Sequence, residues 1–186
     1  MGQSKILLDS NSYFRLAKDI HPLLDTIFGT ENYCLYVLKE LDDEFFRSRR
    51  LQTEFAWVES NEYLSNRQKR LTVSHKDTRA IKLAADFIIR HGIDQELGIS
   101  RIDSLCLAHG HVLSIPVVTD DMDMLQLGSD LAVRTMKTLE LLRLMLDSGH
   151  IDKERVRRIA SYWNYIGDKP ANFRSDFIRI FGERPP

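Results

Sequence analysis

The sequence of 186 residues contains no long hydrophobic run. Its longest apolar stretches, such as residues 6–8, are only a few residues long, whereas a helix that spans a bilayer needs about 20 apolar residues. The first residues, MGQSKILLD, also lack the apolar segment that follows the positive charge of a secretory signal. These absences predict a cytoplasmic protein that has no contact with a membrane.

Cysteine is scarce as well. Only Cys34 and Cys106 are present, which are too few for a disulfide framework and lack metal-ligand spacing, so both thiols are expected to be reduced and buried. His109 and His111 are two residues apart at a helix end, a spacing that argues against zinc. No glycine follows the first predicted strand, where residues 10–12 read Ser-Asn-Ser. This excludes the glycine-rich loop of phosphate-binding nucleotide folds.

What is present is a globular composition with a segregated charge. Hydrophobic residues make up 43% and charged residues 28%, which suits one domain with a sizeable core. Residues 47–90 carry a net charge of +5, residues 91–131 carry −6 and residues 150–186 carry +3. Acid between two basic stretches suits a cation site beside surfaces that attract an anion. Ordinary solvated helix faces would produce the same pattern.

Apolar runs that alternate with helical periodicity predict the fold class. Strands are expected at residues 5–9, 33–37, 115–119 and 131–133, with a charged helix over 39–50, and residues 71–73 form either a strand or the entry to a helix. The alternation favours an α/β/α sandwich with a central parallel sheet. After Met136 the pattern is helical only. We therefore expect a domain over residues 1–135 and a C-terminal helical extension over 136–186 packed on it.

Three acids fall where an open parallel sheet binds its ligands. Asp9 ends the first strand, Asp121 follows the strand that contains Val117 and Val118, and Asp103 starts the helix before it. Clustered carboxylates repel one another unless a cation neutralises them, and hard divalent ions such as Mg²⁺ prefer carboxylate oxygens. The pattern therefore predicts a metal site at the carboxyl edge of the sheet.

Four segments in this order resemble the PIN-domain nucleases. Residues 6–12, ILLDSNS, are similar to the family's opening segment, and residues 37–41, VLKEL, to the helix that carries its second acid. Residues 103–111, DSLCLAHGH, and 117–124, VVTDDMDM, are similar to its third and fourth segments. The resemblance implies a PIN-like sandwich and hydrolysis of RNA phosphodiester bonds that depends on Mg²⁺ or Mn²⁺. Many such nucleases are toxins of toxin–antitoxin pairs of the VapC-like kind, so an antitoxin partner is implied, and a homodimer is compatible with it.

The resemblance also implies roles for individual residues. The catalytic acids would be Asp9, Glu40, Asp103 and Asp121; the metal ligands would be Asp9, Asp103, Asp121 and Asp123; the supporting polar residues would be Asn11 and Thr119. Arg47, Arg49 and Arg50 would bind RNA. Asp120 is expected to be exposed.

Several of these residues have a purely structural explanation. Asp103 stands three residues after Ser100 in a capping box, and Glu40 lies on an acidic helix face that solvent alone would account for. The arginines could serve solubility. Asp9 is the hardest to explain without a function, because an acid that closes an apolar strand is costly to bury without a partner.

The residue at position 11 excludes two other functional classes, and one alternative remains. A haloacid-dehalogenase-type phosphatase needs an acid at position 11, and an integrin-type metal site needs serine there, so Asn11 excludes both. The alternative that stays open is a PIN-like module without catalysis that binds RNA or assembles with proteins.

Overall fold

The sheet at the centre of the molecule has four parallel strands. The computed structural model describes residues 2–186. The strands are β1 (Ser4–Leu8), β2 (Tyr33–Val37), β3 (Val117–Val118) and β4 (Thr135–Met136), in the spatial order β2-β1-β3-β4. β1 pairs with β2 over its whole length and with β3 at Leu7 and Leu8. The first strand in the sequence is therefore a central strand of the sheet.

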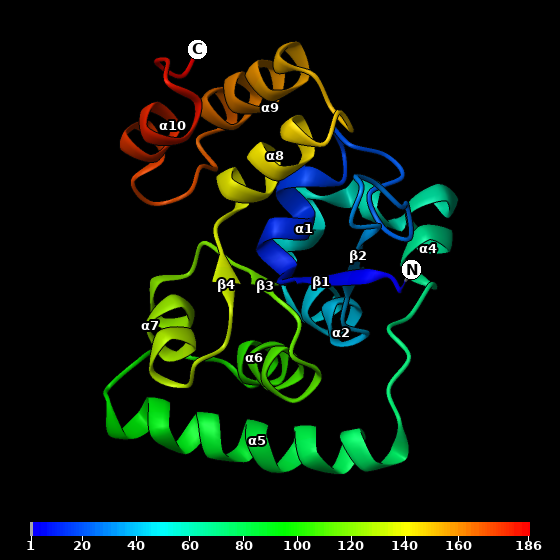
Figure 1. Ribbon diagram of the computed structural model, residues 1–186, viewed down its shortest axis with the longest axis vertical. Helices are drawn as coiled ribbons and strands as arrows, with labels where there is room; N and C mark the ends of the chain where they lie inside the picture. The colour runs from blue at the N-terminus through cyan, green and yellow to red at the C-terminus, as the bar shows by residue number, and fades with distance from the viewer. Residues whose placement is uncertain (1) are drawn as a thin grey trace.

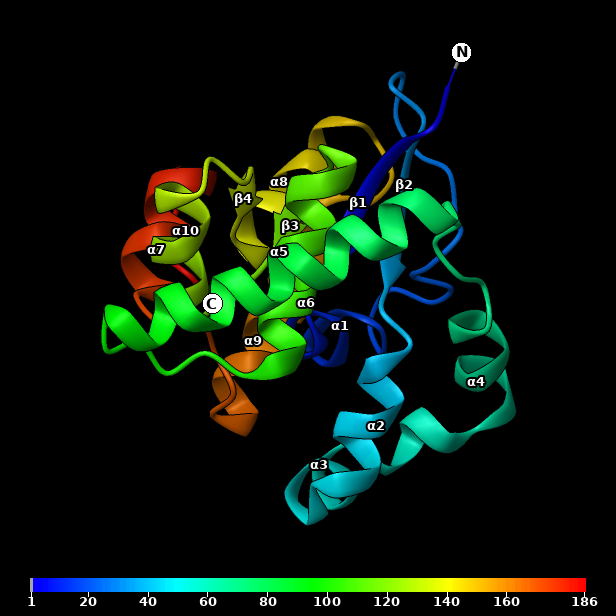
Figure 2. The same ribbon diagram turned by 90° about the horizontal axis from the view of Figure 1, so that it is seen from below.

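Helices cover both faces of this sheet (Figure 1). They are α1 (Ser10–Leu16), α2 (Glu40–Arg47), α3 (Arg49–Glu54), the 3₁₀ helix η1 (Ala56–Glu59), α4 (Asn61–Arg67), α5 (His75–Asp94), α6 (Arg101–Leu113), α7 (Met122–Asp130), α8 (Thr138–Asp147), α9 (Lys153–Ile166) and α10 (Phe173–Phe181). The helices α1 and α8–α10 lie on one side, and α6 and α7 lie on the other with α5 outside them (Figures 1 and 2). The expected α/β class with a parallel sheet is confirmed.

Alternation along the strands creates two cores, one on each face. Ile6 and Leu8 of β1 belong to the core beneath α1 and α8–α10, whereas Leu7 belongs to the core beneath α6 and α7. The same alternation holds in β2, where Leu35 faces the first core and Cys34 the second. Because successive strand side chains point to opposite faces, both faces of the sheet are apolar and both need helical cover.

The elements differ from the sequence-based expectations in two places. Residues 131–133 form no strand, because Ala132 adopts a positive φ of 52° as α7 ends, and the edge strand follows at Thr135–Met136. Residues 71–73 take the second of their two expected forms and lead into α5. The helix expected over 39–50 is broken at Ser48, whose hydroxyl accepts a hydrogen bond from the backbone N–H of Leu51 and starts α3.

The C-terminal helices share the core of the sheet. Trp163 and Phe177 are fully buried in the first core, and the indole N–H of Trp163 donates to the Arg15 carbonyl at 3.1 Å. The boundary expected between residues 135 and 136 falls inside β4. Within residues 2–186, no helix has the length and apolar character needed to cross a bilayer.

Candidate acidic site

Asp9 is fixed at the carboxyl edge of the sheet by strand pairing and by a helix cap. Its backbone N–H donates to the Val118 carbonyl at 3.0 Å, which continues the pairing of β1 with β3. Its Oδ1 accepts a hydrogen bond from the backbone N–H of Ser12 at 2.6 Å, so the side chain caps α1. The residue is only 6% exposed. The carboxylate is therefore both oriented and removed from bulk water.

The charge of this carboxylate is not balanced by a nearby cation. Burial raises the pKa of Asp9 from 3.8 to about 6, and hydrogen bonds from Ser12 and Thr119 lower it only in part. The negative charge of Asp120 raises the pKa further. No cationic side chain is among the main causes of this shift, and none of the ion pairs within residues 2–186 includes Asp9. Such a carboxylate would be relieved by a bound cation.

Asp120 lies beside Asp9 and is held by two helices. Its Oδ2 accepts hydrogen bonds from Arg15 Nη1 at 3.0 Å and from the Thr138 hydroxyl at 2.5 Å, while its Oδ1 accepts from the Thr138 backbone N–H at 3.0 Å. The Thr138 hydroxyl in turn lies 3.1 Å from the hydroxyl of Ser12. The side chain of Asp120 is 6% exposed, although the sequence analysis expects it to be exposed.

Asp121 begins the next helix. Its backbone N–H donates to the Thr119 hydroxyl at 3.1 Å, and its Oδ1 accepts from the Met124 backbone N–H at 2.9 Å as the N-cap of α7. This cap leaves Asp121 exposed. Thr119 itself is fully buried, its hydroxyl donates to Met124 Sδ at 3.4 Å, and its side chain helps to lower the pKa of Asp9.

Asp123 and Asn11 also lie outside the group around Asp9. Asp123 accepts a hydrogen bond from the backbone N–H of Gly98 at 2.8 Å, which ties it to the connection between α5 and α6. Asn11 is exposed on the first turn of α1 and makes no hydrogen bond with the described residues. The backbone N–H of Ser12 orients Asp9 instead.

Asp103 shares a small hollow with Asp9. The hollow measures about 10 Å³, space for roughly one water-sized sphere, and is lined by Leu8, Asp9, Ser10, Leu38, Leu41, Ile102, Asp103 and Cys106. Asp103 also completes the capping box of α6, since its Oδ2 accepts from the Ser100 backbone N–H at 3.0 Å. The capping role and a place beside Asp9 therefore coexist in one side chain.

The pKa of Cys106 indicates which carboxylates lie near the hollow. Burial raises the pKa of its thiol well above the ordinary value, and the negative charges of Asp9, Asp103 and Glu44 raise it further. The thiol is therefore un-ionised, in agreement with the expectation of a buried, unreactive cysteine. Asp9, Asp103 and Glu44 all lie close enough to repel the same buried atom.

Glu44 of α2 lies near this hollow without lining it, since its charge acts on Cys106. Leu41, three residues before it on α2, lines the hollow. Glu40, at the start of α2, lines an adjoining cavity, where its charge acts on His109. The resemblance selects Glu40 as the second acid, and the pKa of Cys106 adds Glu44 as a second candidate on the same helix.

The donor set suits a hard divalent cation. Asp9, Asp103, Glu44 and Asp120 offer carboxylate oxygens, which Mg²⁺ prefers, and no histidine lines the hollow within the described residues. In residues 2–186, no group of three or more acidic, histidine or cysteine side chains is placed so that it could hold a metal ion. The carboxylates match the ion by their chemistry, and the raised pKa of Asp9 is the observation that favours a cation beside it.

The predicted RNA-binding arginines lie near the end of α2. Arg47, Arg49 and Arg50 are all exposed, and they begin one turn after Glu44. Arg50 pairs with Glu54 at 3.0 Å. Arg47 and Arg49 have no carboxylate within salt-bridge distance among residues 2–186. Their positive charge is therefore available to an anion that approaches α2.

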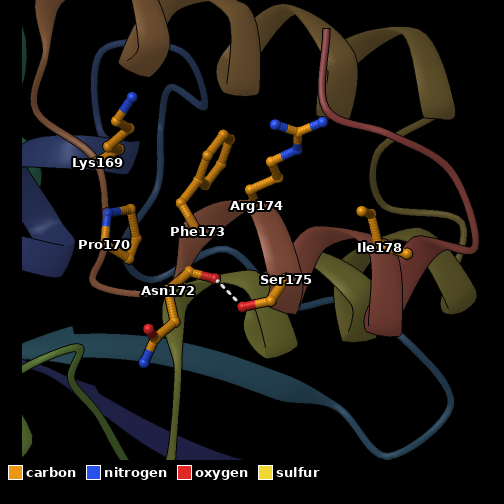
Figure 3. Close-up of a pocket in the computed structure, with 7 residues that line it drawn as sticks. All are labelled: Lys169, Pro170, Asn172, Phe173, Arg174, Ser175 and Ile178. Atoms are coloured by element: carbon orange, nitrogen blue, oxygen red, sulfur yellow. Dashed lines mark hydrogen bonds between the residues drawn. The ribbon is translucent and has the colours of Figure 1, made fainter.

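A wider hollow lies at the start of α10 and does not involve the acids. It measures about 510 Å³ and is lined by Lys169, Pro170, Asn172, Phe173, Arg174, Ser175 and Ile178 (Figure 3). The Ser175 hydroxyl donates to the Asn172 carbonyl at 2.9 Å across the helix start. This hollow shares no residue with the lining around Asp9.

Asp9→Asn is expected to raise the unfolding free energy of the metal-free protein by about 2–3 kcal/mol near pH 8. Asparagine keeps an oxygen for the cap of α1 but removes the buried charge. Folding raises the pKa of Asp9 from 3.8 to about 6. The ionised Asp9 side chain therefore destabilises the wild-type fold: the effect is absent below about pH 4, grows as the pH rises and is complete above about pH 6. Urea denaturation in EDTA at several pH values measures this difference.

Asp121→Asn is the matched control for this measurement. It also removes an acid that caps a helix, but Asp121 is exposed, so we expect a change below about 0.5 kcal/mol. An Asp9→Asn protein no more stable than wild type near pH 8 would show that the buried charge is compensated.

Comparison of the sequence with protein-family models and with curated proteins, and of the fold with solved structures, gives no significant match.

Proposed function

We propose that this chain is a PIN-like, metal-dependent ribonuclease that hydrolyses RNA phosphodiester bonds. The observation that carries the proposal is the buried, uncompensated carboxylate of Asp9 at the edge of the sheet, with Asp103, Glu44 and Asp120 around it. The sequence resemblance supplies the reaction class and the suggested role as a toxin. The geometry supplies a revised set of acids.

The position of each residue suggests a separate role in this proposed reaction. Asp9, Asp103 and Glu44 would hold Mg²⁺ or Mn²⁺, which supplies an activated water and charge neutralisation at the phosphate when bound. The Ser12 backbone N–H keeps the Asp9 carboxylate oriented. Arg15 and Thr138 hold Asp120 in place, so it adds negative charge without moving. Arg47 and Arg49 would attract the RNA backbone.

The test compares two neighbouring acids of α2. A mixed RNA pool is incubated with Mn²⁺ and with wild type, Glu44→Gln or Glu40→Gln, and an EDTA sample shows the metal dependence. Because Glu44 acts on Cys106 in the hollow and Glu40 does not, we expect Glu44→Gln to slow cleavage about 10- to 100-fold. Glu40→Gln is expected to retain cleavage within about threefold.

Three outcomes would contradict this assignment. Loss in Glu40→Gln alone would return the role of second acid to Glu40, and equal loss in both variants would show that Glu44 has no special place. A wild-type protein that is folded and leaves every RNA intact with Mn²⁺ would favour a module that binds RNA or a protein without cleaving it.

A further inference from the structure

A second cavity adjoins the acidic hollow along a neighbouring face of α6. It has a volume of about 320 Å³, which is in the size range of small-molecule sites. Leu38 lines both the cavity and the hollow around Asp9. The consecutive residues Leu105 and Cys106 of α6 line the cavity and the hollow, respectively. A ligand in the cavity would therefore be a neighbour of a ligand at the acids.

The walls of this cavity are formed by apolar side chains, several of which remain partly exposed to solvent. They are formed by Leu38, Leu71, Val73, Ile81 and Leu105. Ile81 and Leu38 are buried, whereas the other three are only half-buried although they pack against the same core. A flat apolar ring that entered here would remove this surface from water.

The rim carries more positive than negative charge. Lys39 and Lys82 lie on it and are exposed, and among residues 2–186 neither has a carboxylate within salt-bridge distance. Arg70 also lines the rim and makes one exposed contact with Asp42, at 3.4 Å. The cavity therefore combines an apolar interior with cations at its mouth, which suits a ligand with a flat apolar body and an anionic group.

Two hydrogen-bond acceptors complete the lining. Nδ1 of His109 lies 2.8 Å from the Leu105 carbonyl, which fixes the proton on Nδ1 in the neutral ring and leaves Nε2 as an acceptor. Nε2 makes no hydrogen bond with the described residues and is not sealed from solvent. A side-chain oxygen of Glu40 is the second acceptor in the same cavity, a role that the amide oxygen in Glu40→Gln would keep. Both acceptors require donors on the ligand.

We propose that this cavity binds one amino-bearing nucleobase of RNA, with its phosphate at Lys39 and Lys82. Adenine, guanine and cytosine each present a flat ring and an exocyclic amino group with two donor hydrogens, whereas uracil has no amino group and offers one N3–H donor between two carbonyl oxygens. Single-stranded RNA exposes such bases to pockets in proteins. This inference rests on the proposed ribonuclease function and places a base beside the phosphate that is cut.

The test measures binding of the four 5′-mononucleotides and of inorganic phosphate to the full chain in EDTA, by calorimetry. We expect at least one of AMP, GMP and CMP to bind at least tenfold more tightly than UMP and phosphate. Lys82→Glu and Thr78→Trp, which reverse a rim charge and fill the cavity, are each expected to weaken that binding at least tenfold. Lys76→Glu changes an exposed lysine of α5 outside the cavity and should leave it unchanged.

The inference is overturned if phosphate or UMP binds as tightly as the other nucleotides, or if the cavity variants bind like Lys76→Glu. Cleavage of RNA without nucleotide binding would refute only the cavity. Nucleotide binding by a protein that cleaves no RNA would refute the nuclease and retain the cavity.

Discussion

Asp9→Asn is expected to reduce metal-dependent RNA cleavage by about 10²- to 10³-fold. Asp9 is buried, is fixed by strand pairing and is oriented by a backbone hydrogen bond, and unlike Asp120 it has no arginine paired with it. Loss of its charge would remove several kcal/mol of interaction with a divalent ion, and about 1.4 kcal/mol corresponds to tenfold in rate. Cleavage rates with Mn²⁺, measured on the RNA pool at saturating protein, test this expectation.

The stability measurement makes this activity result interpretable. The same substitution is expected to stabilise the metal-free fold, so a loss of cleavage cannot then be attributed to unfolding. Mn²⁺ should raise the stability of wild type, by about 2.7 kcal/mol at 100 times its dissociation constant, and should do so much less in Asp9→Asn. Full cleavage by Asp9→Asn would exclude this site as the catalytic centre.

Arg67→Ala is expected to lower the unfolding free energy by about 3–5 kcal/mol. Arg67 is only 2% exposed. Its guanidinium donates to Asp42 Oδ1 at 2.9 Å, to the Val58 carbonyl at 2.8 Å and to the Tyr13 hydroxyl at 3.3 Å. Its loss would leave these groups without their partner and open a cavity between α1, α2 and α4. Urea denaturation followed by circular dichroism gives the change.

Arg70→Ala is the control for this prediction because Arg70 contacts the same acid. Its guanidinium lies 3.4 Å from Asp42 Oδ2, but its side chain is 43% exposed, so its loss should cost less than about 1 kcal/mol. Similar losses for Arg67→Ala and Arg70→Ala would mean that burial adds nothing to the Arg67 interaction.

Local sequence signals were sufficient where an element depends on its own residues. Apolar runs predict β1 and β2 because both strands are buried on two faces. The capping boxes at Ser74 and Ser100 predict the starts of α5 and α6, and in both the serine hydroxyl accepts the expected backbone hydrogen bond. The place of Asp9 at the end of β1 follows from the same local pattern.

The positions of the other acids depend on tertiary contacts that the sequence pattern does not show. Asp120 and Asp121 are adjacent, and only Arg15, 105 residues away, and Thr138, 18 residues away, hold the first of them beside Asp9. The choice between Glu40 and Glu44 depends on how α2 faces α6. Neither contact leaves a periodic pattern along the chain.

The pairing of β1 with β3 also sets the order in which a newly synthesised chain could assemble this site. Asp9 is made before Val118, so its backbone N–H has no strand partner until Val118 follows. Asp120 then needs Thr138, and Arg15 completes its pairs only with Asp168, 153 residues further along. Contacts of such sequence separation form late. During synthesis, the acidic site would therefore assemble only after Asp168 has been made, which would keep the proposed nuclease inactive until that point.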